Sequence, residues 1–464
     1  MMTQVWELSL SDTGTIPRTM RDQGLRSVIF FTPGEVAADD YTGYLTNKTL
    51  TGLFAEAVGG ATLLLEHRYW GESSPYDNLT AETLQYLTLK NSIADVVNVA
   101  KTIDLPFDTN HSSNAGSAPW IFSGGSYSGA LSGWTEATSP GTFYAYHATS
   151  AVVETVWDFW QYFDPVQQGM AKNCSKDVSL VIDYIDSILL NGTAAEKLAL
   201  KTKFGFQDLQ HDDDFASNTT TNGTIPGEEG VGLETALAGY ASWSKDILIP
   251  DYCSAYGFWT DEYDVGCFDS YNTSSPIYTD ISVDNTFNRQ WMWFLCNEPF
   301  GFWQDGAPTS RSSIVSRLVT AEYWSRQCAL YFPTVNGFTY GYAEGQTVDD
   351  INAWTRGWDN TNTTHLIWTN GQYDPWKDAT VSSDFRPGGP LTSTEERPVF
   401  IVEGGFHCSD LLVNNANANS AIAELMNEEV AVMKGWIDEY YATNSSSKAK
   451  RRFERTRQST KFRY

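Results

Sequence analysis

The sequence lacks long hydrophobic runs and is poor in basic residues. No apolar run of roughly 18 or more residues occurs, so no segment is predicted to span a membrane. Lys and Arg number 30 against 57 Asp and Glu, which gives a formal net charge of −27 over 464 residues. This charge argues against nucleic acid or anionic membranes as general partners. It also favours work in an acidic medium, where partly protonated carboxylates repel one another less.

Cysteine and histidine are scarce as well, with six residues of each. The cysteines show no C-x-x-C spacing, so zinc or thioredoxin-type chemistry is not expected, and neither a metal nor another cofactor is predicted. Many disulfide pairings are possible, and the sequence alone does not choose among them. The cysteines are Cys174, Cys253, Cys267, Cys296, Cys328 and Cys408.

Sites for N-linked glycans are frequent, which favours an exported protein. Ten N-x-S/T sequons occur, more than chance gives in a chain of this length. The segment 1–8 lacks the basic and apolar regions of a signal peptide, so we expect the natural N-terminus to extend further. We predict a glycosylated protein that is secreted or vacuolar/lysosomal. The sequon asparagines are Asn47, Asn78, Asn110, Asn173, Asn191, Asn218, Asn222, Asn272, Asn362 and Asn444.

Apolar runs alternate with segments of helical periodicity at both ends of the chain. Strands are predicted at 26–31, 61–65, 120–122, 364–370 and 397–402. Helices are predicted at 51–58, 91–103 and 422–441. Strands that alternate with helices imply a parallel sheet covered on both faces, so the predicted fold class is α/β.

This pattern is interrupted after about residue 147. Aromatic and helical segments without strand alternation predict a mainly helical insertion, which contains a polar surface loop at 212–232. The three aspartates of that loop lack the spacing of a calcium site, and a solvated face is the better interpretation. The predicted parts are a first catalytic part at 1–150, a helical cap at 151–335, a second catalytic part at 336–444 and a basic, disordered tail at 445–464.

A serine lies in a cluster of small residues between a predicted strand and a helical segment. The segment 124–129 reads Gly-Gly-Ser-Tyr-Ser-Gly, with Ser126 in its centre. A strand, a tight turn with a central serine and a helix form the context of a nucleophile elbow, whose neighbours must be small. Ser128 stands where the usual G-x-S-x-G pattern has its second glycine. The alternative is a Gly/Ser-rich loop without chemistry.

An aspartate and a histidine follow in the chain order that this serine requires. A serine hydroxyl needs an imidazole to take its proton, and the imidazole needs a carboxylate to fix its tautomer. Ser126, Asp374 and His407 each follow a predicted strand in the order Ser, Asp, His, so we predict a catalytic triad. The other histidines precede any suitable aspartate, lie in the polar loop or begin a strand: His67, His111, His147, His211 and His365.

Backbone N–H groups are expected to stabilise the oxyanion of the tetrahedral intermediate. One donor is the N–H group of Tyr127, and the other is expected from Gly34 or Glu35 in the loop after the first strand. The triad conflicts in one respect with an acidic working pH. His407 must stay neutral to accept a proton, whereas a buried Asp374 raises its pKa.

Several motifs resemble those of peptidase family S28, which contains lysosomal Pro-X carboxypeptidase, dipeptidyl peptidase II and fungal acidic prolyl endoproteases. They are the segments 66–72, 124–129, 370–376 and 404–407. The resemblance extends from about Val28 to Ala442 and is closest to the fungal endoproteases, through the segments 32–35, 297–299 and 405–410.

The resemblance implies an α/β-hydrolase fold, with a mainly helical cap inserted between the nucleophile half and the Asp/His half. It implies hydrolysis of peptides or proteins after proline, through an acyl-enzyme intermediate. The family's serine, aspartate and histidine correspond to Ser126, Asp374 and His407. Substrate-binding roles are implied for three further residues: Trp291, Glu298 and Trp376.

Two alternatives to an endopeptidase remain open from the sequence. The first is an exopeptidase of the same family, either a Pro-X carboxypeptidase or a dipeptidyl peptidase. The second is a catalytically inactive glycoprotein that binds peptides, because family members usually have a longer cap segment where this chain has 212–232. A lipase or esterase fits less well, since the cap is rich in Trp, Tyr and acidic residues.

Overall fold

A seven-stranded sheet forms the centre of the protein. The computed structural model describes residues 5–10, 27–108, 110–217 and 229–460. The strand order is β1-β3-β2-β4-β5-β8-β9, and neighbours pair in parallel except β1, which is antiparallel to β3. The strands are β1 (Val5–Leu10), β2 (Val28–Phe31), β3 (Ala61–Leu65), β4 (Trp120–Gly125), β5 (Ala145–Thr149), β8 (Leu366–Gly371) and β9 (Val399–Val402).

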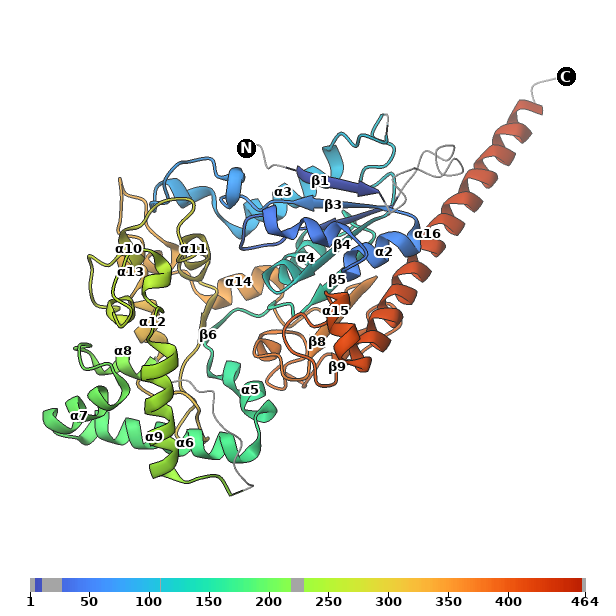
Figure 1. The fold of residues 1–464 in the computed structure, drawn as a ribbon. Helices are drawn as coiled ribbons and strands as arrows, with labels where there is room; N and C mark the ends of the chain where they lie inside the picture. Colours follow the sequence, from blue (N-terminus) through green and yellow to red (C-terminus); the bar gives the residue numbers. More distant parts are fainter. Residues whose placement is uncertain (1–4, 11–26, 109, 218–228, 461–464) are drawn as a thin grey trace.

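Helices cover both faces of this sheet, because successive side chains of each buried strand point to opposite faces. Phe30 and Phe122 pack on the face that carries α3 (Leu89–Thr102), α4 (Tyr127–Thr138) and α14 (Val348–Thr355). Ile29 and Ile121 pack on the face that carries α2 (Leu50–Val58), α15 (Val413–Ala418) and α16 (Ser420–Thr460). The predicted parallel sheet with helices on both faces is therefore confirmed (Figure 1).

A second hydrophobic core lies in the middle of the chain, where Figure 1 shows green and yellow helices to one side of the sheet. Its buried residues run from Val178 to Tyr323. The helices of this part are α5 (Phe163–Gly169), α6 (Lys172–Asn191), α7 (Ala194–Phe204), α8 (Asp212–Ser217), α9 (Leu233–Trp243), α10 (Pro276–Thr279), α11 (Arg289–Asn297), α12 (Ala321–Ser325) and α13 (Cys328–Tyr331). A short parallel pair, β6 (Val156–Asp158) and β7 (Gly301–Trp303), accompanies them. None of the helices in the described ranges has the length and apolar character of a membrane span.

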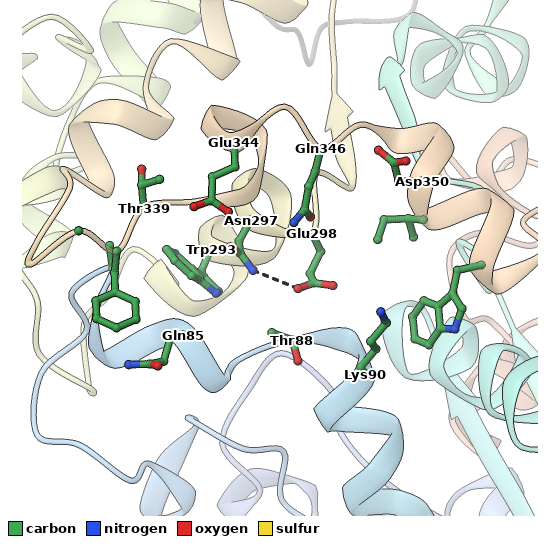
Figure 2. A pocket seen from close by; sticks show the side chains of 15 residues that line it. Gln85, Thr88, Lys90, Trp293, Asn297, Glu298, Thr339, Glu344, Gln346 and Asp350 are labelled. Atoms are coloured by element: carbon green, nitrogen blue, oxygen red, sulfur yellow. Dashed lines mark hydrogen bonds between the residues drawn. The ribbon is translucent and has the colours of Figure 1, made fainter.

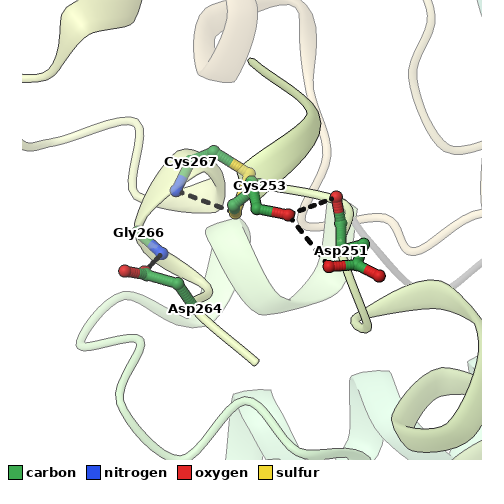
Figure 3. Close-up of a disulfide and its surroundings, with 6 residues drawn as sticks. Asp251, Cys253, Asp264, Gly266 and Cys267 are labelled. Atoms are coloured by element: carbon green, nitrogen blue, oxygen red, sulfur yellow. Dashed lines mark hydrogen bonds between the residues drawn. A yellow bond between two sulfur atoms is a disulfide. The ribbon is translucent and has the colours of Figure 1, made fainter. Parts of the chain in front are cut away.

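Two disulfides hold the middle part of the chain together. Cys253 and Cys267 join within the second core (Figure 3), and the N–H of Cys267 also donates to the Cys253 sulfur at 3.2 Å. Cys296 in α11 joins Cys328 at the start of α13, so it connects two helices that pack against the sheet core. Cys174 and Cys408 are free thiols.

Two predictions for polar segments differ from the structure. The tail at 445–464 was predicted to be disordered, but α16 continues to Thr460. The chain contains no glycine or proline after Gly435, and the Lys, Arg, Ala, Glu and Gln residues of the tail favour helix. Nothing therefore ends the helix earlier. The aspartates of the predicted surface loop begin α8, and Asp214 is buried, where Ser270 and Tyr323 donate hydrogen bonds to it. Residues 218–228 of that loop lie outside the described residues.

Candidate active site

Ser126 occupies a strained turn between β4 and α4. Its backbone angles are φ 58° and ψ −129°, a region that residues with a side chain rarely adopt. The turn is held from both sides, because the Ser126 N–H donates to the Thr149 carbonyl at 3.0 Å and the Ala130 N–H donates to the Ser126 carbonyl at 2.9 Å. This is the geometry of a nucleophile elbow, in which the hydroxyl is presented at the end of a central strand.

Small neighbours make this turn possible. A methyl group at Gly124 would lie 2.3 Å from the Ser128 carbonyl oxygen, and one at Gly129 would lie 2.7 Å from the Thr149 carbonyl oxygen. Both contacts are to backbone atoms, so no side-chain rotation can relieve them. The elbow therefore tolerates no side chain at these two positions.

We expect Gly124→Ala to lower both stability and activity. The added methyl group must displace the first turn of α4, which should cost on the order of 1–3 kcal/mol of unfolding free energy and at least tenfold in turnover. Thermal unfolding and peptide hydrolysis measure the two effects. Gly239→Ala in α9 is the matched control, because a methyl group there has no neighbour within 4 Å. It should leave turnover unchanged and raise the unfolding free energy by about 0.5–1 kcal/mol, since alanine favours helix more than glycine does. Wild-type behaviour of Gly124→Ala would contradict the elbow as described.

Asp374 and His407 come together after neighbouring strands. Asp374 follows β8 and His407 follows β9, and parallel strands bring their carboxyl ends to one edge of the sheet. His407 Nδ1 lies 2.9 Å from Asp374 Oδ1, which also accepts the Trp376 N–H at 2.9 Å. Asp374 is fully buried, whereas His407 is partly exposed. A buried carboxylate in this position fixes the tautomer with the proton on Nδ1 and leaves Nε2 free to act as a base.

The surroundings of His407 favour its charged form. Burial opposes the imidazolium, but the Cys408 side chain and the Asp374 carboxylate outweigh burial and raise the pKa of His407. Burial also raises the pKa of the Cys408 thiol, whereas the neighbouring His407 lowers it. The site therefore stabilises the imidazolium that forms when a serine hydroxyl gives up its proton.

The loop of His407 packs against the elbow of Ser126. A methyl group at Gly125 would lie 2.9 Å from the Cys408 sulfur and 2.7 Å from Leu411 Cδ1, so the two segments are in direct contact. The Cys408 N–H donates to Ser150 Oγ at 2.8 Å, next to the residue whose carbonyl holds Ser126. The structure thus places the three predicted triad residues on adjacent loops at one edge of the sheet.

The loop after β2 lies against the first turn of α4. Gly34 has φ 82°, and a methyl group on it would lie 3.2 Å from Tyr127 Cδ1 and 3.5 Å from the Ser128 nitrogen. The Gly34 N–H lies 3.4 Å from Thr32 Oγ1, a long contact that a stronger acceptor can replace. Burial raises the pKa of Glu35 to about 7, while its own N–H and His407 lower it. The residues predicted to supply the oxyanion donors are therefore neighbours.

Aromatic side chains from the sheet part and the middle part of the chain meet beside this edge. The Trp376 ring lies 6.4 Å from the His407 ring and packs against Phe302 at 5.3 Å. The Trp291 ring, on α11, lies 5.6 Å from Tyr127. Of the three predicted substrate-binding residues, Trp376 therefore lies beside His407 and Trp291 lies beside Tyr127.

Glu298, the third, lies elsewhere. It lines a cavity of about 640 Å³ between the start of α3, α11 and the segment 337–354 (Figure 2). No triad or predicted oxyanion residue lines this cavity. Asn297 Nδ2 donates to the Glu298 carboxylate at 3.0 Å, and burial raises the pKa of Glu298 to about 7. Glu298 therefore lines a cavity apart from the triad, although it is near enough to Tyr127 to add to the effect of burial and Glu35, which raise the pKa of that phenol.

The sequence as a whole matches one family of peptidases. The sequence profile described as "Serine carboxypeptidase S28" matches residues 19–225 and 250–427, which is most of the chain. The chain belongs to the serine carboxypeptidase S28 family. This S28 protein is a serine-type peptidase, and the predicted resemblance is confirmed.

Several characterised or named proteins are similar to this S28 peptidase over most of its length. "Serine protease vicPa" of Bipolaris victoriae (strain FI3) is 40% identical, covering 90% of this chain and 84% of that protein. "Probable extracellular serine carboxypeptidase" of Arthroderma benhamiae is 27% identical (88% and 62%), and "Lysosomal Pro-X carboxypeptidase" of Pongo abelii is 22% identical (89% and 82%).

Solved structures similar to this S28 peptidase include several hydrolases. VinJ has a TM-score of 0.35 at 11% identity, covering 92% of this chain and 98% of that chain. Proline iminopeptidase of Mycobacterium smegmatis has a TM-score of 0.32 at 10% identity, covering 88% and 91%. The observed sheet order, the elbow and the helices on both faces are those of an α/β-hydrolase, as predicted.

One histidine of this S28 peptidase lies close to the site but was not predicted from the sequence. His147 was set aside because it precedes any suitable aspartate, yet it is fully buried on β5 and contacts Asp410 in the His407 loop. The available signal was a histidine in the short segment Ala145–Thr149, whose other residues can be buried in a strand. Its carboxylate partners, Asp410 and Glu429, are more than 200 residues away in the sequence, so no local pattern identifies them.

Proposed function

We propose that this S28 peptidase hydrolyses peptide bonds on the carboxyl side of proline through an acyl-enzyme on Ser126. The observation that carries this proposal is the contact of 2.9 Å between His407 Nδ1 and buried Asp374, on a loop packed against the serine elbow. His407 Nε2 takes the Ser126 proton while the oxygen attacks the carbonyl carbon, and then donates it to the leaving nitrogen. Water, activated by the same histidine, releases the acid.

The proposed oxyanion donors are the N–H of Tyr127 at the start of α4 and an N–H of Gly34 or Glu35. Their support is the close packing of the Gly34 loop on α4, together with the helix N-terminus that points toward the developing charge. These donors should stabilise the tetrahedral intermediate more than the ground state, which is the requirement for catalysis.

Proline preference is supported by the aromatic walls beside His407. Trp376 contacts Phe159, Tyr162 and Phe302 at ring distances of 5.7, 5.2 and 5.3 Å, and these residues come from different parts of the chain. A rigid pyrrolidine ring fits a flat aromatic slot because it buries apolar area without losing side-chain freedom. We also propose Trp291 and Trp376 as substrate contacts, and Glu298 as a more distant one.

An acidic and exported setting is part of the proposal. It is supported by the net charge of −27 and by the names of the relatives, which include extracellular and lysosomal enzymes. Most sequon asparagines are exposed and available for glycans, but Asn173 is buried and should not carry one. The raised pKa of His407 acts in the opposite direction, since a protonated imidazole cannot accept the Ser126 proton, so it limits activity on the acid side.

Product mapping by mass spectrometry tests the specificity and the mode of cleavage. The substrate is a peptide with one internal proline, prepared with free ends and with both ends blocked, and a version with alanine in place of proline is the control. The proposal predicts cleavage after proline in both forms and at least tenfold slower cleavage of the alanine peptide. Release of only the residue after a penultimate proline would assign the carboxypeptidase mode. Equal cleavage of the alanine peptide would contradict proline preference.

A further inference from the structure

His147 lies at the centre of a buried polar cluster directly below the elbow. It is fully buried on β5, between Ser123 on β4 and Ile367 on β8. Its side chain points to the sheet face that packs against α2 and α16, where the Phe54 ring lies 5.5 Å away. A parallel sheet covered on both faces normally carries apolar residues at such positions, so a histidine here requires specific partners.

The partners come from the His407 loop and from the last helix. His147 Nε2 lies 3.1 Å from Asp410 Oδ2 and 3.5 Å from Glu429 Oε1, while Nδ1 lies 3.0 Å from Ser123 Oγ. Asp410 is 1% exposed and Glu429 is fully buried. Threonine hydroxyls complete the cluster, with Thr149 donating to Asp410 and Thr369 donating to Glu429.

The cluster is close to electrically neutral when Glu429 is protonated. Burial opposes charge on His147, but hydrogen bonds to Asp410 and Glu429 raise the pKa of His147 to about 9. Burial and the nearby Asp410 carboxylate raise the pKa of Glu429 to about 7. One imidazolium then balances one carboxylate, as a fully buried site requires.

The same cluster holds the catalytic loop. Asp410 follows His407 by three residues, and Thr149 binds it through its hydroxyl while the Thr149 carbonyl accepts the Ser126 N–H at 3.0 Å. The end of β5 is therefore a common support for the loop of the base and for the turn of the nucleophile. A shift of Asp410 would move the imidazole relative to the serine without touching either side chain.

We propose that His147 is a positioning residue, which anchors the His407 loop through Asp410 and thereby sets the distance between His407 and Ser126. The proposal rests on the triad proposed above. His147, Asp410 and Glu429 also form a group whose ligand atoms lie within 4.8 Å of one another, as a metal site would require. His147, Thr149 and Thr369 direct hydrogen-bond donors at the two carboxylates, which favours a hydrogen-bonded network over a metal site.

Two variants of His147 separate positioning from general stability. Glutamine places an amide near the position of Nε2 and should keep the bond to Asp410, whereas asparagine reaches only toward Ser123. We expect His147→Asn to lower kcat by about 10- to 100-fold with KM nearly unchanged, because a small displacement of the base is costly. His147→Gln should retain kcat within about threefold. His365→Gln is the control, since His365 packs against Trp436 on α16 without joining the cluster.

Thr149→Val provides a second test if the histidine variants fold poorly. It is nearly isosteric and removes only the hydroxyl that binds Asp410, while the backbone carbonyl that holds Ser126 remains. We expect a loss of kcat of about tenfold. Thr369→Val, which removes the matching donor to Glu429, should change kcat less because Glu429 is not in the His407 loop.

Three outcomes would overturn the proposal. They are wild-type kcat in both His147→Asn and Thr149→Val, equal losses in His147→Asn and His147→Gln, and a stoichiometric metal ion found by elemental analysis of the purified wild-type enzyme. A wild-type protein that neither cleaves peptides nor reacts with a fluorophosphonate would instead refute the proposed triad. The two failures are therefore distinguishable.

Discussion

Replacement of Ser126 by alanine is expected to lower peptide turnover by about 10⁴- to 10⁶-fold and to leave the fold intact. In the proposed mechanism this hydroxyl forms the bond to the substrate carbonyl, and removal of a triad member leaves only the contribution of binding and oxyanion stabilisation. Hydrolysis of a proline peptide and the far- and near-ultraviolet circular dichroism spectra measure the two parts of this expectation.

Ser128 offers a matched control for this variant. It lies two residues away, is 1% exposed, and its hydroxyl has no hydrogen-bond partner within the described ranges of the chain. Ser128→Ala removes a hydroxyl from the same turn without removing a bond, so kcat should change by less than about threefold. Full activity of Ser126→Ala, or equal losses in the two variants, would contradict the assignment of the nucleophile.

The second large effect is greater stability in mild acid than at pH 8. Burial raises the pKa of Glu298 and Glu429 to about 7, and that of Asp214 and Asp378 to about 6. The folded protein therefore holds protons that the unfolded chain releases above about pH 4 to 4.5. The contribution of these groups to the free energy of unfolding is therefore fully present below that range and is lost as the pH rises through about 6 to 7.

The size of this effect follows from the number of buried carboxyl groups. A pKa difference of about 2.5 corresponds to on the order of 3 kcal/mol for a fully buried group. His147 acts in the same direction at higher pH, because its folded pKa of about 9 lies above its usual value and its contribution is lost between about pH 6.5 and 9. We expect the midpoint of thermal unfolding to be about 10 °C higher at pH 5 than at pH 8.

Glu298 and Glu344, which line one cavity, provide a matched pair of variants for this prediction (Figure 2). Glu298 is 8% exposed and Glu344 is exposed on the same cavity wall. Glu298→Gln replaces a carboxyl group that is protonated in acid by a neutral amide, so it should flatten the pH dependence of the unfolding midpoint. Glu344→Gln should leave the dependence unchanged. An unfolding midpoint that is constant or rises from pH 5 to pH 8 would contradict the raised pKa values.

The sequence predicted the elements that carry strong local signals. β2, β3, β4, β8 and β9 were found because they are apolar runs that end in turn residues. β5 was missed, since Ala145–Thr149 includes His147 and Thr149, whose polarity hid a central strand. The antiparallel β1 at the sheet edge was also missed, because Val5–Leu10 alternates polar and apolar residues in a short segment.

For the site, chain order and strand context were sufficient to predict that the loops of Ser126, Asp374 and His407 lie at one edge of the sheet. They indicate which loops meet, because parallel strands end at one edge of a sheet. They do not indicate what surrounds a residue on a distant helix. Glu298 directly follows α11 and is close to Trp291 in sequence, yet it lines a separate cavity. The partners of His147 likewise depend on the packing of α16 against the sheet, which no local pattern encodes.

Covalent labelling with a fluorophosphonate tests the central claim most directly, since only a serine activated by a neighbouring base reacts rapidly. We predict one label per chain, located on Ser126 by peptide mapping, and at least 100-fold slower labelling in His407→Gln. Absence of labelling in the folded wild-type protein would support a peptide-binding protein without catalysis. Labelling of a different serine would also contradict the proposed triad.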